Sequence, residues 1–87
     1  MDEYELNEEQ NLLKALARKD VKAFAKLYND YKDDLVIFTF CRVQDIQTAT
    51  LIVDKVFERL WFEAKFYQVT PPIYQYLLAE VRKSCQL

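Results

Sequence analysis

Aromatic side chains are concentrated in one short stretch of this 87-residue chain. Six of them lie between positions 61 and 76, namely Trp61, Phe62, Phe66, Tyr67, Tyr74 and Tyr76. The basic residues Lys65, Arg82 and Lys83 lie within or shortly after this stretch. Exposed aromatic rings stack on unpaired bases and cations bind phosphates, so these residue types suit single-stranded nucleic acid. Large aromatic residues also anchor the cores of small domains, which is the structural alternative for each ring.

The sequence offers little for enzymatic catalysis. It contains no histidine and no glycine, so the commonest general base and the glycine-rich phosphate loop are both missing. Asp33 and Asp34 are adjacent, but adjacent side chains on a helix diverge, which favours a solvated face. Cys41 and Cys85 match no metal-ligand or redox spacing. We therefore predict a protein that is not an enzyme and uses no metal and no cofactor.

The cysteine content and the apolar runs bear on the compartment. Because the two cysteines belong to no metal-binding or redox motif, the simplest interpretation is that both are free thiols in a reducing cytoplasm. No basic-then-apolar leader opens the chain. The longest apolar run, 35–41, is far short of the roughly 20 residues that span a bilayer. The sequence thus predicts a cytoplasmic protein with no membrane partner.

Charge is distributed unevenly along the chain. Five of the 14 acidic residues and none of the 12 basic residues lie in positions 1–10. Residues 11–87 therefore carry nine acids against 12 bases, a net charge of +3. This balance lets the folded part approach a polyanion, although no strong basic patch requires one.

The stretch 45–61 is the element around which we expect the fold to be organised. With Asp45 as N-cap, helical spacing places one apolar stripe on it, with Ile52 at the border. The stripe consists of Ile46, Ala49, Val53, Val56, Phe57 and Leu60. The opposite face carries Gln47, Leu51, Asp54 and Glu58. A leucine in the middle of a polar face is either an ordinary exposed residue or part of a docking surface.

A long second helix is predicted before this element. Asp20 is its N-cap and it should continue to about Val43. Its apolar stripe consists of Val21, Phe24, Leu27, Tyr28, Tyr31, Leu35 and Phe38. The segments 35–41 and 46–53 are rich in β-branched and aromatic residues and are also compatible with strands. Unbroken three-four spacing favours helices, and we expect 35–41 to be buried on most sides.

Two more helices complete the prediction. Residues 1–6 form a flexible lead-in and Asn7 caps the first helix. A loop over 65–70 precedes the last helix, with Thr70 as N-cap and Pro71 in its first position. We therefore predict an all-α fold, a compact antiparallel bundle of three to four helices, as a single domain over 1–87.

Several segments of the sequence together resemble region two of the extracytoplasmic-function (ECF) sigma factors of RNA polymerase, with Bacteroidetes-type members the most similar. The resemblance covers about residues 11–87. It is carried by Leu12-Leu13-Lys14, Asp20-x-Lys22-Ala23-Phe24-x-x-Leu27-Tyr28-x-x-Tyr31, Val53-x-x-Val56-Phe57-x-Arg59-Leu60-Trp61, Ile73-x-x-Tyr76-Leu77 and Val81-Arg82-Lys83.

The resemblance implies a function in transcription initiation. Region two is a helical domain whose central helix binds the clamp helices of the polymerase β′ subunit. Its last helix and the preceding loop bind the single-stranded −10 promoter element. The family also makes an anti-sigma factor a candidate partner, and the chain contains no region-four domain for the −35 element. By position, the polymerase-binding residues are Gln47, Leu51, Asp54, Lys55 and Glu58. The DNA-binding residues are Lys65, Phe66, Tyr67, Tyr74, Arg82 and Lys83.

A second functional hypothesis uses the same scaffold. Where the family usually has acidic residues, the central helix has Leu51 and Lys55, and Glu80 adds an acid near the expected DNA. These differences favour a sigma-like helical protein-interaction module that has lost promoter recognition. A duplex-reading helix-turn-helix protein is a third possibility, which the long second helix disfavours because such motifs use short helices.

Overall fold

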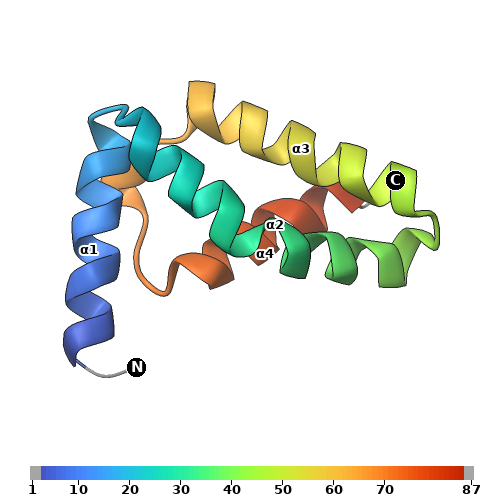
Figure 1. The fold of residues 1–87 in the computed structure, drawn as a ribbon, viewed down its shortest axis with the longest axis horizontal. Helices are drawn as coiled ribbons and strands as arrows, with labels where there is room; N and C mark the ends of the chain where they lie inside the picture. The colour runs from blue at the N-terminus through green and yellow to red at the C-terminus, as the bar shows by residue number, and fades with distance from the viewer. Residues whose placement is uncertain (1–2, 86–87) are drawn as a thin grey trace.

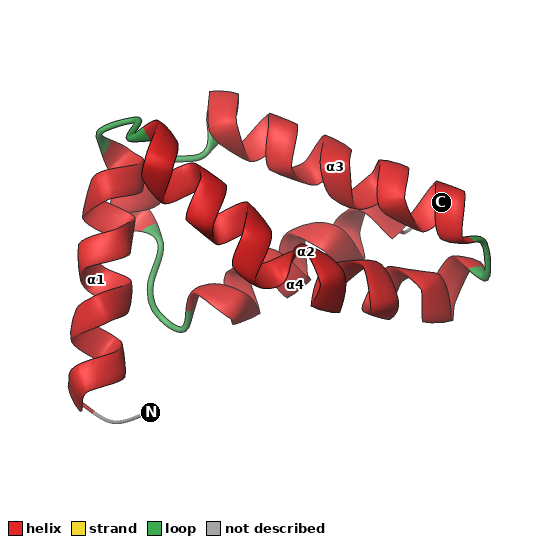
Figure 2. Cartoon of the chain, in the orientation of Figure 1, coloured by secondary structure: helices red, strands yellow, loops and turns green. Residues whose placement is uncertain are grey.

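The computed structural model describes residues 3–85, and it describes the side chains of residues 8–66 and 68–85. This part of the chain is all-α and contains no strand (Figure 2). Its elements are the helices α1 (Glu3–Ala17), α2 (Val21–Val43), α3 (Ile46–Glu63) and α4 (Ile73–Cys85), and the 3₁₀ turn η1 (Phe66–Gln68). The predicted all-α bundle is confirmed, and the strand alternative for 35–41 and 46–53 is wrong.

α2, α3 and α4 pack against one another as a three-helix bundle, with α3 antiparallel to the other two, and α1 crosses one end of this bundle (Figure 1). α2 packs most extensively against α3, and both contact α4. α1 contacts η1 and α2 instead. This arrangement leaves the side of α3 that faces away from α2 and α4 without a covering helix.

Local capping explains where α2 and α3 begin. The Asp20 carboxylate accepts hydrogen bonds from the amides of Lys22 and Ala23 at 2.9 and 3.3 Å. Asp45 accepts from the amide and the hydroxyl of Thr48. These donors stabilise the charged carboxylate and lower the pKa of Asp45. Both predicted N-caps are therefore confirmed.

The α2–α3 connection needs a left-handed residue although the chain has no glycine. Gln44 takes that conformation with φ 59°, and its amide donates to the Phe40 carbonyl at 2.7 Å. Lys19 does the same after α1, with φ 62°. Its ammonium group donates to the Trp61 carbonyl and lies 5.0 Å from the Trp61 ring centroid. Lys19 thereby fastens the α1–α2 turn to the last part of α3.

The core is built from the predicted stripe of α3, from the inner faces of α2 and α4, and from side chains of α1 and η1. Every predicted stripe residue of α3 except Ile46 is buried. The buried apolar residues are Leu13, Leu16, Leu27, Leu35, Val36, Ala49, Val53, Val56, Phe57, Leu60, Phe66, Ile73, Leu77 and Val81.

Two residues expected in the core are exposed. Ile46 and Val21 are 55% and 68% exposed. Each is the first residue of its helix, at the end of a helix pair, where fewer neighbouring side chains are available than along the middle. Periodicity assigned the correct side of the helix but carries no information on how far the covering helices extend.

The expectation that 35–41 is buried on most sides is also wrong. Leu35, Val36 and Thr39 are buried, whereas Ile37 and Phe40 are 62% and 42% exposed. The reason is that α3 and α4 cover one side of this half of α2, while α1 contacts α2 elsewhere. An apolar surface therefore remains on the outer side of α2.

Two helix boundaries differ from the prediction. α1 begins at Glu3 and not after Asn7, so most of the expected lead-in is helical. Carboxylates near a helix N-terminus complement its dipole, which favours this longer helix. Residues 1–2 lie outside the described part of the chain. α4 begins at Ile73 and not at Pro71. Pro71 precedes another proline, and a residue before proline avoids the helical region.

Candidate functional site

The outer face of α3 is the most exposed apolar surface that the predicted site residues form. Gln47, Leu51, Lys55 and Glu58 are all exposed and lie on one stripe, since helical residues advance by about 100°. Leu51 is 59% exposed. Four of the five predicted polymerase-binding residues are therefore brought together on one accessible face.

Phe62 extends this surface and was not among the predicted docking residues. It is 72% exposed and lies on the same stripe as Leu51, three helical turns further along. At 1.5 Å per residue, the two apolar side chains are separated by about 16 Å along the axis. Lys55 and Glu58 lie between them. The signal in the sequence is the eleven-residue spacing from Leu51 to Phe62, which places both side chains on one side of a helix.

Asp54 is the exception among the predicted docking residues. It is half-buried, and its Oδ1 accepts a hydrogen bond of 2.8 Å from the Tyr28 hydroxyl on α2. Asp54 lies on the flank of α3 that faces α2, and it joins the two helices. The expectation that it belongs to the outer face is therefore wrong.

Phe66 does not form a stacking platform. Its side chain is only 2% exposed and belongs to the hydrophobic core. The 3₁₀ turn η1 folds back onto α1, and this turn directs the ring inward. The predicted assignment of Phe66 to DNA binding is therefore wrong. The length of the loop does not indicate that this ring is buried. The side chain of Tyr67, another predicted DNA-binding residue, lies outside the described residues.

Tyr74 is half-buried and already has a stacking partner. Its ring lies against Tyr31 with centroids 5.7 Å apart and an interplanar angle of 26°. Only the other face of the ring is available to a base. The residue therefore contributes to α2–α4 packing, which is the structural alternative considered for the aromatic cluster.

Trp61 is likewise used in packing. The centroid of its ring lies 4.9 Å from that of Phe24. The ring centroids of Phe24 and Tyr28 lie 6.1 and 5.1 Å, respectively, from that of Phe57. Together these rings form an aromatic seam between α2 and α3. The core alternative is thus the correct interpretation for Trp61.

Of the remaining predicted DNA-binding residues, Lys65 and Lys83 lie on the α3–α4 side of the molecule, whereas helical spacing places Arg82 about 120° around α4 from Tyr76. Lys65 and Tyr76 line one shallow hollow of about 390 Å³. Tyr76 is half-buried, and this partial burial raises the pKa of its hydroxyl. A second hollow joins Tyr76 to Arg59 and Glu80. These hollows make a continuous strip that runs from the loop toward the end of α4.

Glu80 occupies the middle of this strip. Its Oε2 lies 3.3 Å from the Arg59 guanidinium and its Oε1 lies 3.6 Å from the Lys83 ammonium. Arg82 and Lys83 are exposed in the last turn of α4. We define Arg59, Lys65, Tyr76 and Lys83 as the basic strip, although the carboxylates of Glu63, which lines both hollows, and Glu80 also lie in it. Sequence reasoning missed Arg59 because its proximity to α4 depends on the helix packing.

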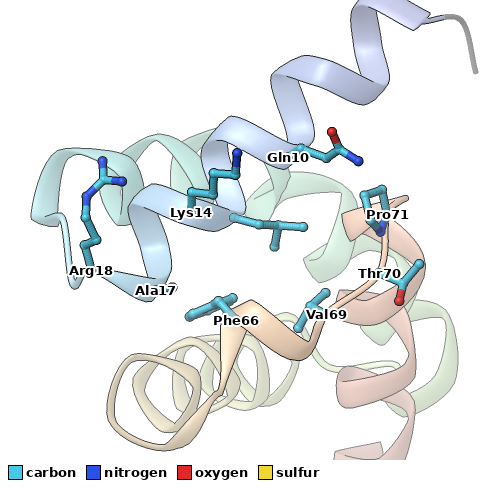
Figure 3. Close-up of a pocket in the computed structure, with 9 residues that line it drawn as sticks. Gln10, Lys14, Ala17, Arg18, Phe66, Val69, Thr70 and Pro71 are labelled. Atoms are coloured by element: carbon cyan, nitrogen blue, oxygen red, sulfur yellow. The ribbon is translucent and has the colours of Figure 1, made fainter.

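A third feature lies between α1 and the loop that follows α3 (Figure 3). It is a groove of about 750 Å³. α1 contributes Gln10, Leu13, Lys14, Ala17 and Arg18 to it. The loop contributes Phe66, Val69, Thr70 and Pro71. The sequence did not predict this groove, because nothing in it indicates that the loop folds back onto α1.

One side chain of α1 also reaches α4. The Ile73 amide, the first of α4, donates to Oε1 of Glu9 at 3.0 Å. The other oxygen, Oε2, is buried without a hydrogen-bond partner among the described residues. Partial burial, and then the Glu9 carboxylate, raise the pKa of the neighbouring Tyr31. Glu9 therefore acts as the N-terminal cap of α4, the role predicted for Thr70.

Comparison with known proteins yields no match: no family model, curated protein or solved structure matches this chain. The similarity to sigma region two therefore stays a prediction from the sequence segments. Within residues 3–85 no helix is long and apolar enough to cross a membrane. In the same part of the chain no group of three or more acidic or cysteine side chains is placed to hold a metal ion.

Proposed function

We propose that the protein is a sigma region-two-like domain that acts in transcription initiation. Its outer α3 face binds the clamp helices of the RNA polymerase β′ subunit. Its basic strip, at the loop and α4, binds the single-stranded −10 promoter element. The observation that carries the proposal is the exposure of Leu51 and Phe62 on one stripe of α3, which no helix of the described fold covers.

The chemistry of the two surfaces differs in the way that this function requires. The α3 face carries two apolar anchors with Lys55 and Glu58 between them, so each anchor can enter its own pocket on the partner while the two charges meet polar groups. The basic strip places Lys65 and Arg59 beside Tyr76, and Lys83 lies next to Glu80 at the α4 end of the strip. Cations and a partly exposed ring suit a single strand, whose binding combines phosphate contacts with base stacking.

The polymerase interaction is tested by binding to a peptide pair that reproduces the β′ clamp helices. We expect Leu51→Ser and Phe62→Ser each to weaken binding about tenfold, because a few apolar anchors that become buried dominate interface energetics. Ile37→Ser is the matched control, since Ile37 is 62% exposed on α2 and outside this face. Equal losses for Leu51→Ser and Ile37→Ser, or no binding by the unchanged protein at modest salt, contradict the proposal.

DNA binding is tested by fluorescence anisotropy with a single-stranded oligonucleotide. Lys65→Gln and Lys83→Gln should each lower the affinity about threefold at 0.1 M salt. Each should also reduce the slope of log K against log salt by about 0.7, the value for one lost phosphate contact. Lys22→Gln, an exposed lysine at the start of α2, should change neither quantity.

The second candidate function is a protein-interaction module without DNA recognition. The burial of Phe66 and the Tyr31–Tyr74 stack favour it, because both remove rings from the predicted platform. The Glu80 carboxylate within the basic strip also opposes a polyanion. Clamp binding that depends on Leu51, combined with DNA affinity that Lys65→Gln and Lys83→Gln leave unchanged, would support this candidate over the first.

A further inference from the structure

The groove between α1 and the loop after α3 has the features of a small-molecule site that neither proposed function uses. Its volume of about 750 Å³ lies within the range of about 300–1,000 Å³ for ligand sites. Its lining combines an apolar floor with a few polar groups, as such sites usually do. It lies on the α1 side of the loop, whereas the basic strip lies on the α3–α4 side.

The floor is fixed and apolar. Phe66 and Leu13 are 2% and 6% exposed, so both are held by the core and present only a small area to the groove. Val69 is half-buried on the loop side, and Ala17 keeps the α1 side open because it is small. The apolar area open to a ligand is therefore mainly that of Val69, Ala17 and Pro71, and it favours a flat apolar group.

The rim is cationic. Lys14 and Arg18 are one helical turn apart on α1 and both line the groove at its outer edge, where their charged ends point away from Phe66 and Val69 (Figure 3). Both are exposed, and within the described side chains neither forms a salt bridge with an acidic residue. By contrast, Lys26 on α2 is paired with Asp30 at 2.8 Å. The two groove cations are therefore available to an anion from outside the chain.

We propose that this groove binds a small aromatic oxyanion, with its ring against Val69 and Pro71 and its anionic group beside Lys14 and Arg18. A neutral aromatic molecule would leave the cations unused, and a simple inorganic anion would leave the apolar floor uncovered. Gln10 and Thr70, at the Pro71 end, offer an amide and a hydroxyl to a polar substituent of the ring. Bound there, the ligand joins α1 to the loop.

The test uses the complete chain and amide chemical shifts, with 2-naphthoate as the probe. The matched probes are 2-naphthalenemethanol, which has the ring without the charge, and inorganic phosphate, which has the charge without the ring. We expect 2-naphthoate to shift the amides of residues 10–18 and 66–70. It should bind at least fivefold more tightly than either matched probe.

Variants of the rim make the assignment specific. Lys14→Gln combined with Arg18→Gln should weaken 2-naphthoate at least fivefold and leave the neutral alcohol unchanged. Lys22→Gln combined with Lys26→Gln is the control with the same spacing and the same change in charge. Ala17→Glu, at an exposed position where folding should be retained, should also weaken 2-naphthoate.

The proposal is overturned if the alcohol binds as tightly as 2-naphthoate, if the shifted amides lie elsewhere, or if both double variants behave alike. None of these measurements involves polymerase or DNA. Failure of the groove proposal is therefore distinguishable from failure of the proposed function.

Discussion

Glu9 shows how one side chain can connect distant parts of a small domain. It belongs to the first helix, yet it accepts the first amide of α4 at 3.0 Å. Pro71 and Pro72 have no amide hydrogen to offer, so Ile73 is the first donor of this helix and is itself completely buried. A buried donor without an acceptor is costly, which gives this single contact its importance.

We predict that Glu9→Ala lowers the free energy of unfolding by about 1–2 kcal/mol, the usual range for loss of a helix cap. Glu9→Gln should cost less, because its side-chain carbonyl can still accept from Ile73. The measurement is urea denaturation, with Ile73 amide exchange as the local readout. Glu8→Ala changes the exposed neighbouring carboxylate and should leave both quantities unchanged.

Equal denaturation midpoints for Glu9→Ala and Glu8→Ala would contradict this assignment. So would an Ile73 amide that exchanges at the same rate in both variants. Either result would mean that another group caps α4 in solution.

At the scale of elements, the sequence correctly predicts those features that depend only on residues nearby in the chain, such as helix caps and buried stripes. Asp20 and Asp45 cap α2 and α3 because a carboxylate two or three residues before a free amide is a local arrangement. The buried stripe of α3 also follows from spacing alone. Leu51 is exposed as predicted, because it lies opposite that stripe.

The errors share a different physical origin. Phe66, Asp54 and Ile46 each needed knowledge of which helix lies beside them and where that helix ends. Phe66 is buried because η1 packs on α1, and Asp54 is half-buried because Tyr28 lies across from it. Neither contact leaves a pattern in the sequence. The groove beside Lys14 was missed for the same reason.

The α2–α3 hairpin carries a local conformational cost that can be removed. Gln44 is left-handed with φ 59°, a conformation that costs an L-residue about 1–2 kcal/mol. We predict that Gln44→Gly raises the free energy of unfolding by about 0.5–1 kcal/mol, since glycine reaches this conformation freely but loses more chain entropy. Urea denaturation monitored by circular dichroism measures this change in the free energy of unfolding.

The control for this prediction is glycine at an ordinary helical position. Lys55→Gly, at an exposed site inside α3, should lower stability by about 1 kcal/mol. If Gln44→Gly were also destabilising, the left-handed geometry of the connection would not hold in solution.

For the whole molecule, the packing divides the chain into two parts that differ in how many other elements each helix contacts. α2, α3 and α4 contact one another extensively, whereas α1 contacts η1 and α2 and reaches α4 through the Glu9 cap. Leu16 is 1% exposed, and it belongs with Leu13 and Phe66 to the hydrophobic core. Local stability usually follows the density of buried contacts, so α1 and the loop should open together before the rest of the bundle.

Hydrogen exchange under native conditions tests this division. We predict that the amides of α1 and of 66–69 exchange through a shared opening with a lower free energy than the middle of α2 and α3. Leu16→Ala, which removes a fully buried leucine side chain at a cost of about 2–4 kcal/mol, should speed exchange in both segments. Protection in the central turns of α2 and α3 should persist, because those turns pack on each other.

Val53→Ala, in the centre of α3, should instead lower protection throughout. If Leu16→Ala lowers protection equally in all helices, the domain is one cooperative unit, and α1 cannot open separately from the helices that carry the α3 docking face.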